Sequence, residues 1–231
     1  MQNKKIKEKE FKLLPNSGIL SAPVYKGGEQ PDLSKHEIIK LNSNENPLGP
    51  SKLATDALKN SFEFINNYPS SSHEKLRKAI AKVHAINFEN IICGAGSDEL
   101  ISFICQCFCS TNDEVIYTEH GFAMYKISAL LRGANPVKVL ENERVADVDN
   151  ILKSCNNKTK IVFLANPNNP TGTYIPKKEL IYLRKKLRSN ILLVVDDAYF
   201  EYLKQKDYLS GLRLFSKDKN VLVTRTFSKA Y

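Results

Sequence analysis

Two apolar runs constrain the fold of this chain more than any other feature of its sequence. Lys160–Ala165 reads KIVFLA and Ile191–Val195 reads ILLVV, and neither run alternates polar with apolar residues. Such strands are typical of parallel sheets that helices cover on both faces. Shorter β-branched runs and amphipathic stretches alternate with them along the chain. The pattern predicts an α/β fold with three layers and a mostly parallel sheet.

The expected elements follow one another closely after residue 50. We expect strands at 91–93, 114–118, 136–140, 160–165, 191–195 and 220–224. We expect helices at 52–64, 73–84, 97–109, 122–132, 147–155 and 177–188. Residues 1–50 are polar and contain Pro and Gly, so they predict an N-terminal arm, and residues 51–231 predict one large domain.

Composition narrows the class of protein. Of 231 residues, 42% are hydrophobic and 26% charged, as in ordinary globular domains. No apolar run approaches the ~18–20 residues that span a bilayer, so we expect no membrane contact. The first twelve residues, MQNKKIKEKEFK, lack the apolar segment of a secretory signal. The odd number of cysteines, five, predicts reduced thiols and a cytoplasmic location.

The net charge of +9 is concentrated in residues 1–12 and 177–190. The second stretch reads KKELIYLRKKLRSN, with Leu180, Leu183 and Leu187 at helical spacing, which predicts an amphipathic helix with a solvated basic face. Because no nucleic-acid-binding motif accompanies the charge, we expect no nucleic-acid partner. The four histidines do not cluster, so we expect no metal site.

Polar motifs rich in Gly or Pro follow four of the expected strands. They read GAGSDEL after 91–93, NPNNPTG after 160–165, DDAY after 191–195 and RTFSKAY after 220–224. Ligands of open α/β sheets bind beyond the carboxyl ends of the strands. The sequence therefore predicts a binding site at that edge of the sheet.

Each motif has a functional and a plain interpretation. Gly94–Asp98 leads from a strand into a helix, which suits a phosphate, or it is a tight turn capped by Ser97. The stiff loop 166–172 can aim an Asn amide at a ligand, or it is a surface turn. Asp196 is a buried carboxylate in need of a cation, or a helix N-cap. Lys229 is an activated amine, or a solvated charge.

Taken in this order, the motifs resemble those of the fold-type I aminotransferases that use pyridoxal 5′-phosphate (PLP). The resemblance covers roughly residues 40–231 and includes LNSNENPLGPS at 41–51, NNYPSSS at 66–72 and EHGFAMY at 119–125. N-E-N-P followed by Y-P and G-S-D-E is similar to the histidinol-phosphate branch of the family. The resemblance implies the large domain of that fold.

The resemblance also implies PLP as cofactor and a role for each matching residue. Lys229 would bind PLP covalently and Asp196 would contact the ring nitrogen. Phe122 would stack on the ring, where many relatives carry Tyr. The other implied contacts are to the phenolic oxygen (Asn169, Tyr199), to the phosphate (Gly96, Ser97, Asp98, Thr226, Ser228), to the cofactor phosphate of a neighbouring subunit (Tyr68) and to the substrate (Asn46).

The activity implied is transamination of the small molecule histidinol phosphate with 2-oxoglutarate, in a homodimer with shared active sites. The alternatives are an aromatic aminotransferase, a threonine-phosphate decarboxylase or a non-enzymatic PLP-binding module. The chain stops at Tyr231, before the Gly-rich segment, the C-terminal small domain and the two arginines of the family. We therefore expect residues 1–231 alone to be a truncated and inactive form.

Overall fold

The computed structural model describes residues 15–25, 27–28, 32 and 39–231. Its centre is a five-stranded sheet in the order β2-β1-β3-β4-β5, and every neighbouring pair of strands is parallel. The strands are β1 (Glu114–Thr118), β2 (Asn135–Val139), β3 (Thr159–Ala165), β4 (Leu192–Asp196) and β5 (Val221–Thr224). The predicted α/β fold with a parallel sheet is confirmed.

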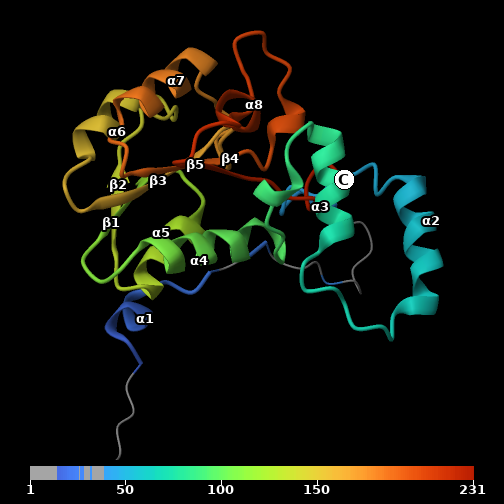
Figure 1. The fold of residues 1–231 in the computed structure, drawn as a ribbon. Coiled ribbons are helices and arrows are strands. Elements are labelled where there is room, and N and C mark those ends of the chain that lie inside the picture. The colour runs from blue at the N-terminus through green and yellow to red at the C-terminus, as the bar shows by residue number, and fades with distance from the viewer. Residues whose placement is uncertain (1–14, 26, 29–31, 33–38) are drawn as a thin grey trace, which may run out of the picture.

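Helices cover both faces of this sheet (Figure 1). One layer holds α4 (Gly96–Phe108) and α5 (Ala123–Leu131), and the opposite layer holds α6 (Val148–Ser154), α7 (Lys177–Lys186) and α8 (Gly211–Phe215). Beyond the sheet lie α2 (Lys52–Ser61), the 3-10 turn η1 (Phe62–Phe64) and α3 (Glu74–His84). Two further 3-10 turns are η2 (Phe88–Asn90) and η3 (Phe200–Tyr202).

The two central strands send alternate side chains into two separate cores. Ile161 and Phe163 of β3, with Leu192 and Val194 of β4, belong to the core beneath α4 and α5. The residues between them along each strand belong to the core beneath α6, α7 and α8. Both sets are apolar because both faces of the sheet are covered. The same alternation decides where the side chains that follow β4 point.

The structure differs from the sequence prediction at residues 91–93 and within the N-terminal arm. Residues 91–93 form no strand, so that prediction is wrong; the side chain of Ile92 is 77% exposed, and the run joins η2 directly to α4. The arm, where the structure describes it, contains the short helix α1 (Ser17–Ser21). This helix lies against α5 so closely that a Cβ on Gly18 would clash with the carbonyl oxygen of Leu130.

The solvated basic face predicted for 177–190 is wrong at one position. Arg184 is buried, and its guanidinium donates to the carbonyl oxygens of Leu187, Arg188 and Ile191 at 2.9–3.0 Å. These carbonyls belong to the turn that follows α7 and leads into β4. Arg184 therefore joins α7 to the start of β4, and the remaining basic residues of α7 face solvent.

Candidate active site

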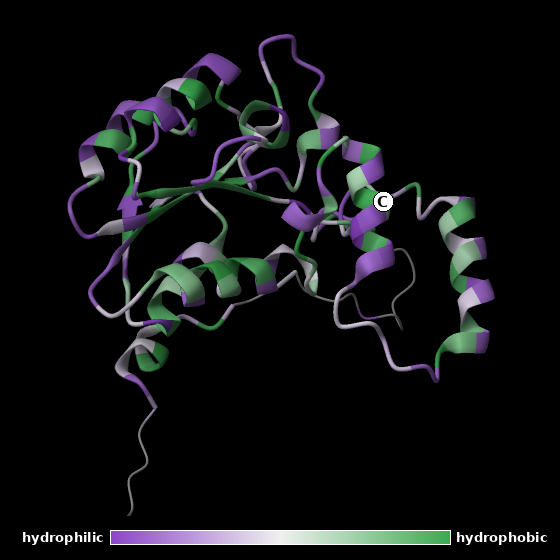
Figure 2. Ribbon diagram, viewed as in Figure 1, coloured by the Kyte–Doolittle hydropathy of each residue, from purple (hydrophilic) through white to green (hydrophobic). Residues whose placement is uncertain are grey.

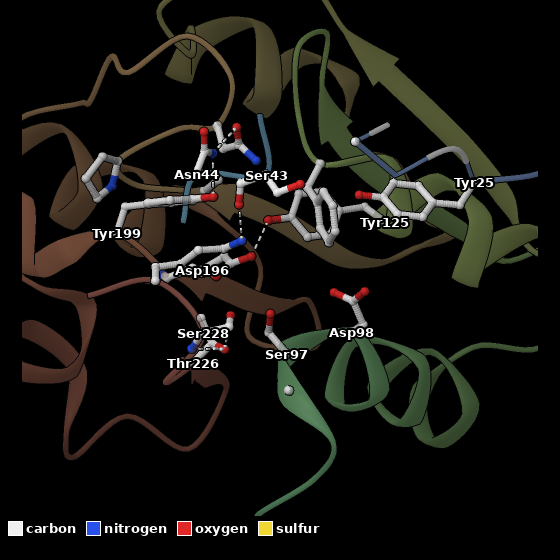
Figure 3. A pocket seen from close by; sticks show the side chains of 18 of the residues that line it. Tyr25, Ser43, Asn44, Ser97, Asp98, Tyr125, Asp196, Tyr199, Thr226 and Ser228 are labelled. Carbon is white, nitrogen blue, oxygen red and sulfur yellow. Dashed lines mark hydrogen bonds between the residues drawn. The ribbon is translucent and has the colours of Figure 1, made fainter. Parts of the chain in front are cut away.

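A pocket of about 620 Å³ opens where the carboxyl ends of the strands meet the start of α4 (Figure 3). Segments far apart in sequence supply its walls. Ten of the twelve residues that sequence reasoning proposed for the site line it: Gly96, Ser97, Asp98, Phe122, Asn169, Asp196, Tyr199, Thr226, Ser228 and Lys229. The structure thus brings the predicted motifs to one cavity.

The two adjacent aspartates at the end of β4, Asp196 and Asp197, point to opposite faces of the sheet. Asp196 continues the alternation of Leu192 and Val194, so its carboxylate lies on the α4–α5 side and lines the pocket. It is 5% exposed, and burial raises its pKa. Asp197 lies on the other side, where Ser210 Oγ donates to it at 2.5 Å. Of the two, only Asp196 faces the pocket.

Asp196 accepts hydrogen bonds from uncharged donors. Tyr125 Oη donates to its Oδ2 at 2.6 Å, and the backbone N–H of Ala198 donates to its Oδ1 at 3.2 Å. Among the residues that the structure describes, no Lys or Arg pairs with this carboxylate. A buried carboxylate of this kind attracts a cationic group of a ligand.

The amine of Lys229 lies between the backbone of Ser43 and the ring of Tyr199 in the pocket wall. Its Nζ donates to the backbone oxygen of Ser43 at 3.2 Å and lies 5.9 Å from the centre of the Tyr199 ring. The Tyr199 hydroxyl accepts from Asn44 Nδ2 at 2.9 Å, and the same amide donates to Asn169 Oδ1 at 3.3 Å. Ser43 and Asn44 therefore connect Lys229, Tyr199 and Asn169 by hydrogen bonds.

The start of α4 and the loop before Lys229 form the polar end of the pocket. Gly96 opens the helix with φ +77°, a conformation that suits glycine, and a Cβ there would meet open space. Ser97 and Asp98 follow in its first turn. Across from them, Thr226 Oγ1 and Ser228 Oγ lie 2.8 Å apart. Hydroxyls and helix N–H groups in this arrangement suit an anion such as a phosphate.

The loops behind the pocket are tied to one another. His120 Nδ1 lies 2.7 Å from Glu141 Oε2, and the backbone N–H of His120 donates to Glu141 Oε1 at 3.1 Å. Asn168 Nδ2 donates to the backbone oxygen of His120 at 3.3 Å. These bonds connect the segments that carry Phe122 and Asn169, which both line the pocket.

Two of the proposed site residues lie outside the pocket. The side chain of Tyr68 is 96% exposed on the segment after η1, so its role toward a neighbouring subunit stays a prediction. Asn46 Nδ2 donates to the backbone oxygen of Ala230 at 3.2 Å, beside Lys229 but not in the pocket wall. Its role toward a substrate also stays a prediction.

Sequence reasoning missed Asn44 and Tyr125. Both line the pocket, and each donates to a residue that was predicted. Tyr125 follows Phe122 by three residues at the start of α5, a spacing that places the two on one helix face and could have revealed it. Nothing in the run LNSNENP shows which of its asparagines faces a ligand, since that depends on the path of the arm.

Membrane-spanning helices and metal-ligand clusters are both absent from the described residues. No helix among them is long and apolar enough to cross a bilayer. In the same part of the chain, no group of three or more His, Cys, Asp or Glu side chains is placed to hold a metal ion.

Comparisons with known proteins give the pocket its context. The chain is 50% identical over 219 residues to a histidinol-phosphate aminotransferase of Ruegeria sp. (strain TM1040), a match that covers 95% of this chain and 60% of that protein. It is 51% identical over 207 residues to one of Pelagibacter ubique (strain HTCC1062), covering 90% of this chain and 58% of that protein. The chain thus spans about 60% of the length of such curated relatives.

Solved structures share the fold. A histidinol-phosphate aminotransferase from Sinorhizobium meliloti, solved in complex with pyridoxal-5′-phosphate, superposes with a TM-score of 0.77 at 27% identity, covering 82% of this chain and 52% of that one. The model of the family "Aminotransferase class I and II" matches residues 36–231. With this match over most of its length and these motifs gathered in one pocket, the chain belongs to the class I and II aminotransferase family.

Proposed function

We propose that the pocket binds PLP and that the protein transfers an amino group from histidinol phosphate to 2-oxoglutarate, giving imidazole-acetol phosphate and glutamate. One observation carries the proposal. The pocket brings together a lysine amine, a buried carboxylate that pairs with no lysine or arginine of the described residues, and a helix N-terminus flanked by hydroxyls. The relatives at about half identity, which are named for this reaction, support the choice of substrate.

The donor set fits each chemical group of PLP. The start of α4, with Thr226 and Ser228, would bind the phosphate dianion. Asp196 would pair with the protonated ring nitrogen, a charge-assisted bond that offsets the burial of the carboxylate. Phe122 offers an aromatic face to the ring. The remaining implied contacts, to the phenolic oxygen, come from Asn169 and Tyr199, which Asn44 already joins.

Lys229, the segment 43–44 and Asn46 would each have a separate role in the proposed reaction. When bound, PLP supplies an electron sink for the charge that develops at the substrate Cα. Lys229 would hold the cofactor covalently and, once released by an incoming amine, carry a proton between the substrate Cα and the cofactor C4′. Its Nζ now donates to the Ser43 oxygen, so the 43–44 segment keeps the amine inside the pocket. Asn46 would contact the substrate from the same segment.

The homodimer is part of the same proposal. Large apolar side chains are exposed along α2, η1 and the residue after η1. Their exposed fractions lie between 58% and 83% for Leu53, Leu58, Phe62, Phe64 and Ile65. Figure 2 shows apolar residues on α2, which stands apart from the sheet. An exposed apolar surface of this kind is typical of a subunit interface. We propose that a second copy covers it and that Tyr68, which follows it, reaches the partner's cofactor phosphate.

Mixing the two inactive variants Tyr68→Ala and Lys229→Ala tests this proposal. Hybrid dimers should regain activity, because one of their two sites carries both native residues. No recovery despite proven subunit exchange would count against shared active sites.

Two further expectations complete the proposal. We propose residues 1–50 as an N-terminal arm and 51–231 as the cofactor-binding large domain. Ser43 and Asn44, at the described end of the arm, contact the pocket wall. Limited proteolysis in the presence and absence of PLP tests the division, since cleavage within 39–50 should slow when PLP is bound. We propose a cytoplasmic location, which fractionation of cells tests.

The first experiment concerns the cofactor. Residues 1–231 are incubated with PLP, reduced with borohydride and mapped by peptide mass spectrometry. The pyridoxyl group should lie on Lys229, and Lys126→Ala, which removes an exposed lysine of α5, should leave the labelling intact. Label on another lysine would refute the assignment.

The second experiment concerns the reaction. The protein expressed from its complete gene is tested for glutamate formation with histidinol phosphate, aromatic amino acids and threonine phosphate as separate substrates. A higher kcat/KM for histidinol phosphate supports the proposal. Preference for one of the others, or PLP binding without turnover, would contradict it.

A further inference from the structure

The shortest hydrogen bond to the carboxylate of Asp196 comes from the side chain of Tyr125. The hydroxyl of Thr224 at the end of β5 also lowers the pKa of Asp196, as a weaker contribution than that of Tyr125. The two carboxylate oxygens accept from the Tyr125 hydroxyl at 2.6 Å and from the Ala198 N–H at 3.2 Å. Burial favours the neutral acid, whereas donors to its oxygens favour the ionised form. The Tyr125 hydroxyl makes the shorter of these two hydrogen bonds. No lysine or arginine among the described residues forms an ion pair with Asp196.

The ring of Tyr125 is held in place on two sides. It stacks on Phe163 with ring centres 4.7 Å apart and planes 3° apart, and the Phe122 ring meets it at 5.9 Å and 89°. Tyr125 is 1% exposed. Its hydroxyl therefore has a fixed direction, and it stays protonated because burial raises the pKa of Tyr125 well above its ordinary value.

Titratable groups from the other pocket walls face this pair. The charge of Asp98 in α4 raises the pKa of both Asp196 and Tyr125. Tyr199, in the loop after β4, raises the pKa of Tyr125. The charge of Lys229 lowers the pKa of Asp98. Asp98 opposes ionisation of Asp196, because two like charges in one pocket repel. The donation from Tyr125 works against that repulsion.

We propose that Tyr125 is a positioning residue whose hydroxyl keeps Asp196 ionised and aimed into the pocket before any ligand arrives. The proposal rests on the proposed function, because an ionised Asp196 is what a protonated ring nitrogen requires. Tyr125 also touches Phe122, so a single buried side chain of α5 aligns the carboxylate with the aromatic face proposed for the ring.

The test is the variant Tyr125→Phe, which keeps the ring and removes only the hydroxyl. Its matched control is Tyr117→Phe, which removes a hydroxyl from the same core without touching Asp196. The titration of Asp196 is followed by NMR of chain 1–231 labelled with ¹³C in its aspartate carboxyls, with Asp196→Asn assigning the signal. The midpoint in Tyr125→Phe should rise by about one pH unit or more, a tenfold change in proton affinity.

Cofactor binding gives a second readout. The Kd for PLP of Tyr125→Phe, divided by that of the unaltered chain, should be about tenfold at a pH below both measured Asp196 midpoints. The ratio should approach one at a pH above both midpoints, where Asp196 is ionised in both chains. A purely structural role would weaken binding equally at both pH values. An unchanged Asp196 midpoint would overturn the proposal, and so would a shifted midpoint with no change in the Kd ratio.

A cofactor-free titration and a second substitution at position 125 separate this proposal from the proposed function and from a failure to fold. The titration is measured without cofactor, so its failure is distinct from a failure to label Lys229, which would refute the proposed function. If Tyr125→Phe is too unstable to titrate, 3-fluorotyrosine at position 125 supplies a stronger donor of nearly the same size. The Asp196 midpoint should then fall, and an unchanged or higher midpoint would overturn the proposal.

Discussion

Replacing Asp197 by asparagine should stabilise the chain at alkaline pH and have a much smaller effect in mild acid. Asp197 is 1% exposed, and its carboxylate accepts from Ser210 Oγ at 2.5 Å and from the Gly211 N–H at 3.4 Å. Burial raises its pKa from 3.8 to about 7, although its two donors and the charge of Arg225 oppose the shift. Asparagine offers the same shape and can bond both partners without a charge.

The sign of the effect follows from the direction of the shift. A carboxyl with a raised pKa in the folded chain binds its proton more tightly there than in the unfolded chain. The stability that it contributes is complete below pH 3.8 and is lost as the pH rises through about 7. Each pKa unit corresponds to about 1.4 kcal/mol, so the total loss is about 4 kcal/mol, and about 2–3 kcal/mol of it falls between pH 5 and pH 8.

Urea denaturation of residues 1–231 at pH 5 and at pH 8 measures this. The gain in free energy of unfolding from Asp197→Asn should be about 2–3 kcal/mol larger at pH 8 than at pH 5, with an unchanged m-value. Asp218→Asn, which removes an exposed carboxyl between α8 and β5, is the control for the loss of one negative charge. An equal gain at both pH values, or a larger one at pH 5, would refute the reasoning.

Three further variants test other parts of the structure. Arg184→Lys cannot reach the three carbonyls that Arg184 bonds, so urea unfolding should show a loss of ~1.5–3 kcal/mol; a neutral result would mean that those bonds add nothing. His120→Leu removes the partner side chain of Glu141 and should cost ~1–3 kcal/mol, whereas His120→Asn keeps a donor near Nδ1 and should recover most of the loss in the same assay. Leu183→Ala, at a fully buried position of α7, should cost ~2–5 kcal/mol by calorimetry, and less than 1 kcal/mol would contradict its place in the core.

Local sequence was sufficient where the signal was long and repeated. The uninterrupted apolar runs of β3 and β4 predicted buried parallel strands, because only a sheet covered on both faces hides every side chain of a strand. It was insufficient for 91–93, where three apolar residues look like a strand but have no strand beside them in the described chain. A strand is defined by its neighbours, and a short run does not reveal them.

Arg184 shows a second limit. Its spacing among other basic residues indicates a solvated helix face, yet a long, forked side chain can reach the carbonyls of the turn after α7. Whether that chain turns inward depends on where β4 begins relative to the helix, and helical periodicity carries no information about such a contact.

The sequence alone determined the chemistry that this chain can offer: a lysine after one strand, aspartates after another, an Asn-Pro loop after a third and a glycine turn into a helix. Their convergence could be expected, because parallel strands deliver their carboxyl ends to one edge. Only the tertiary structure decided that Asn44 closes the wall and that Tyr125 meets Asp196. The contact partners in these bonds are 155 and 71 residues apart, and packing, not local pattern, selects partners over such distances.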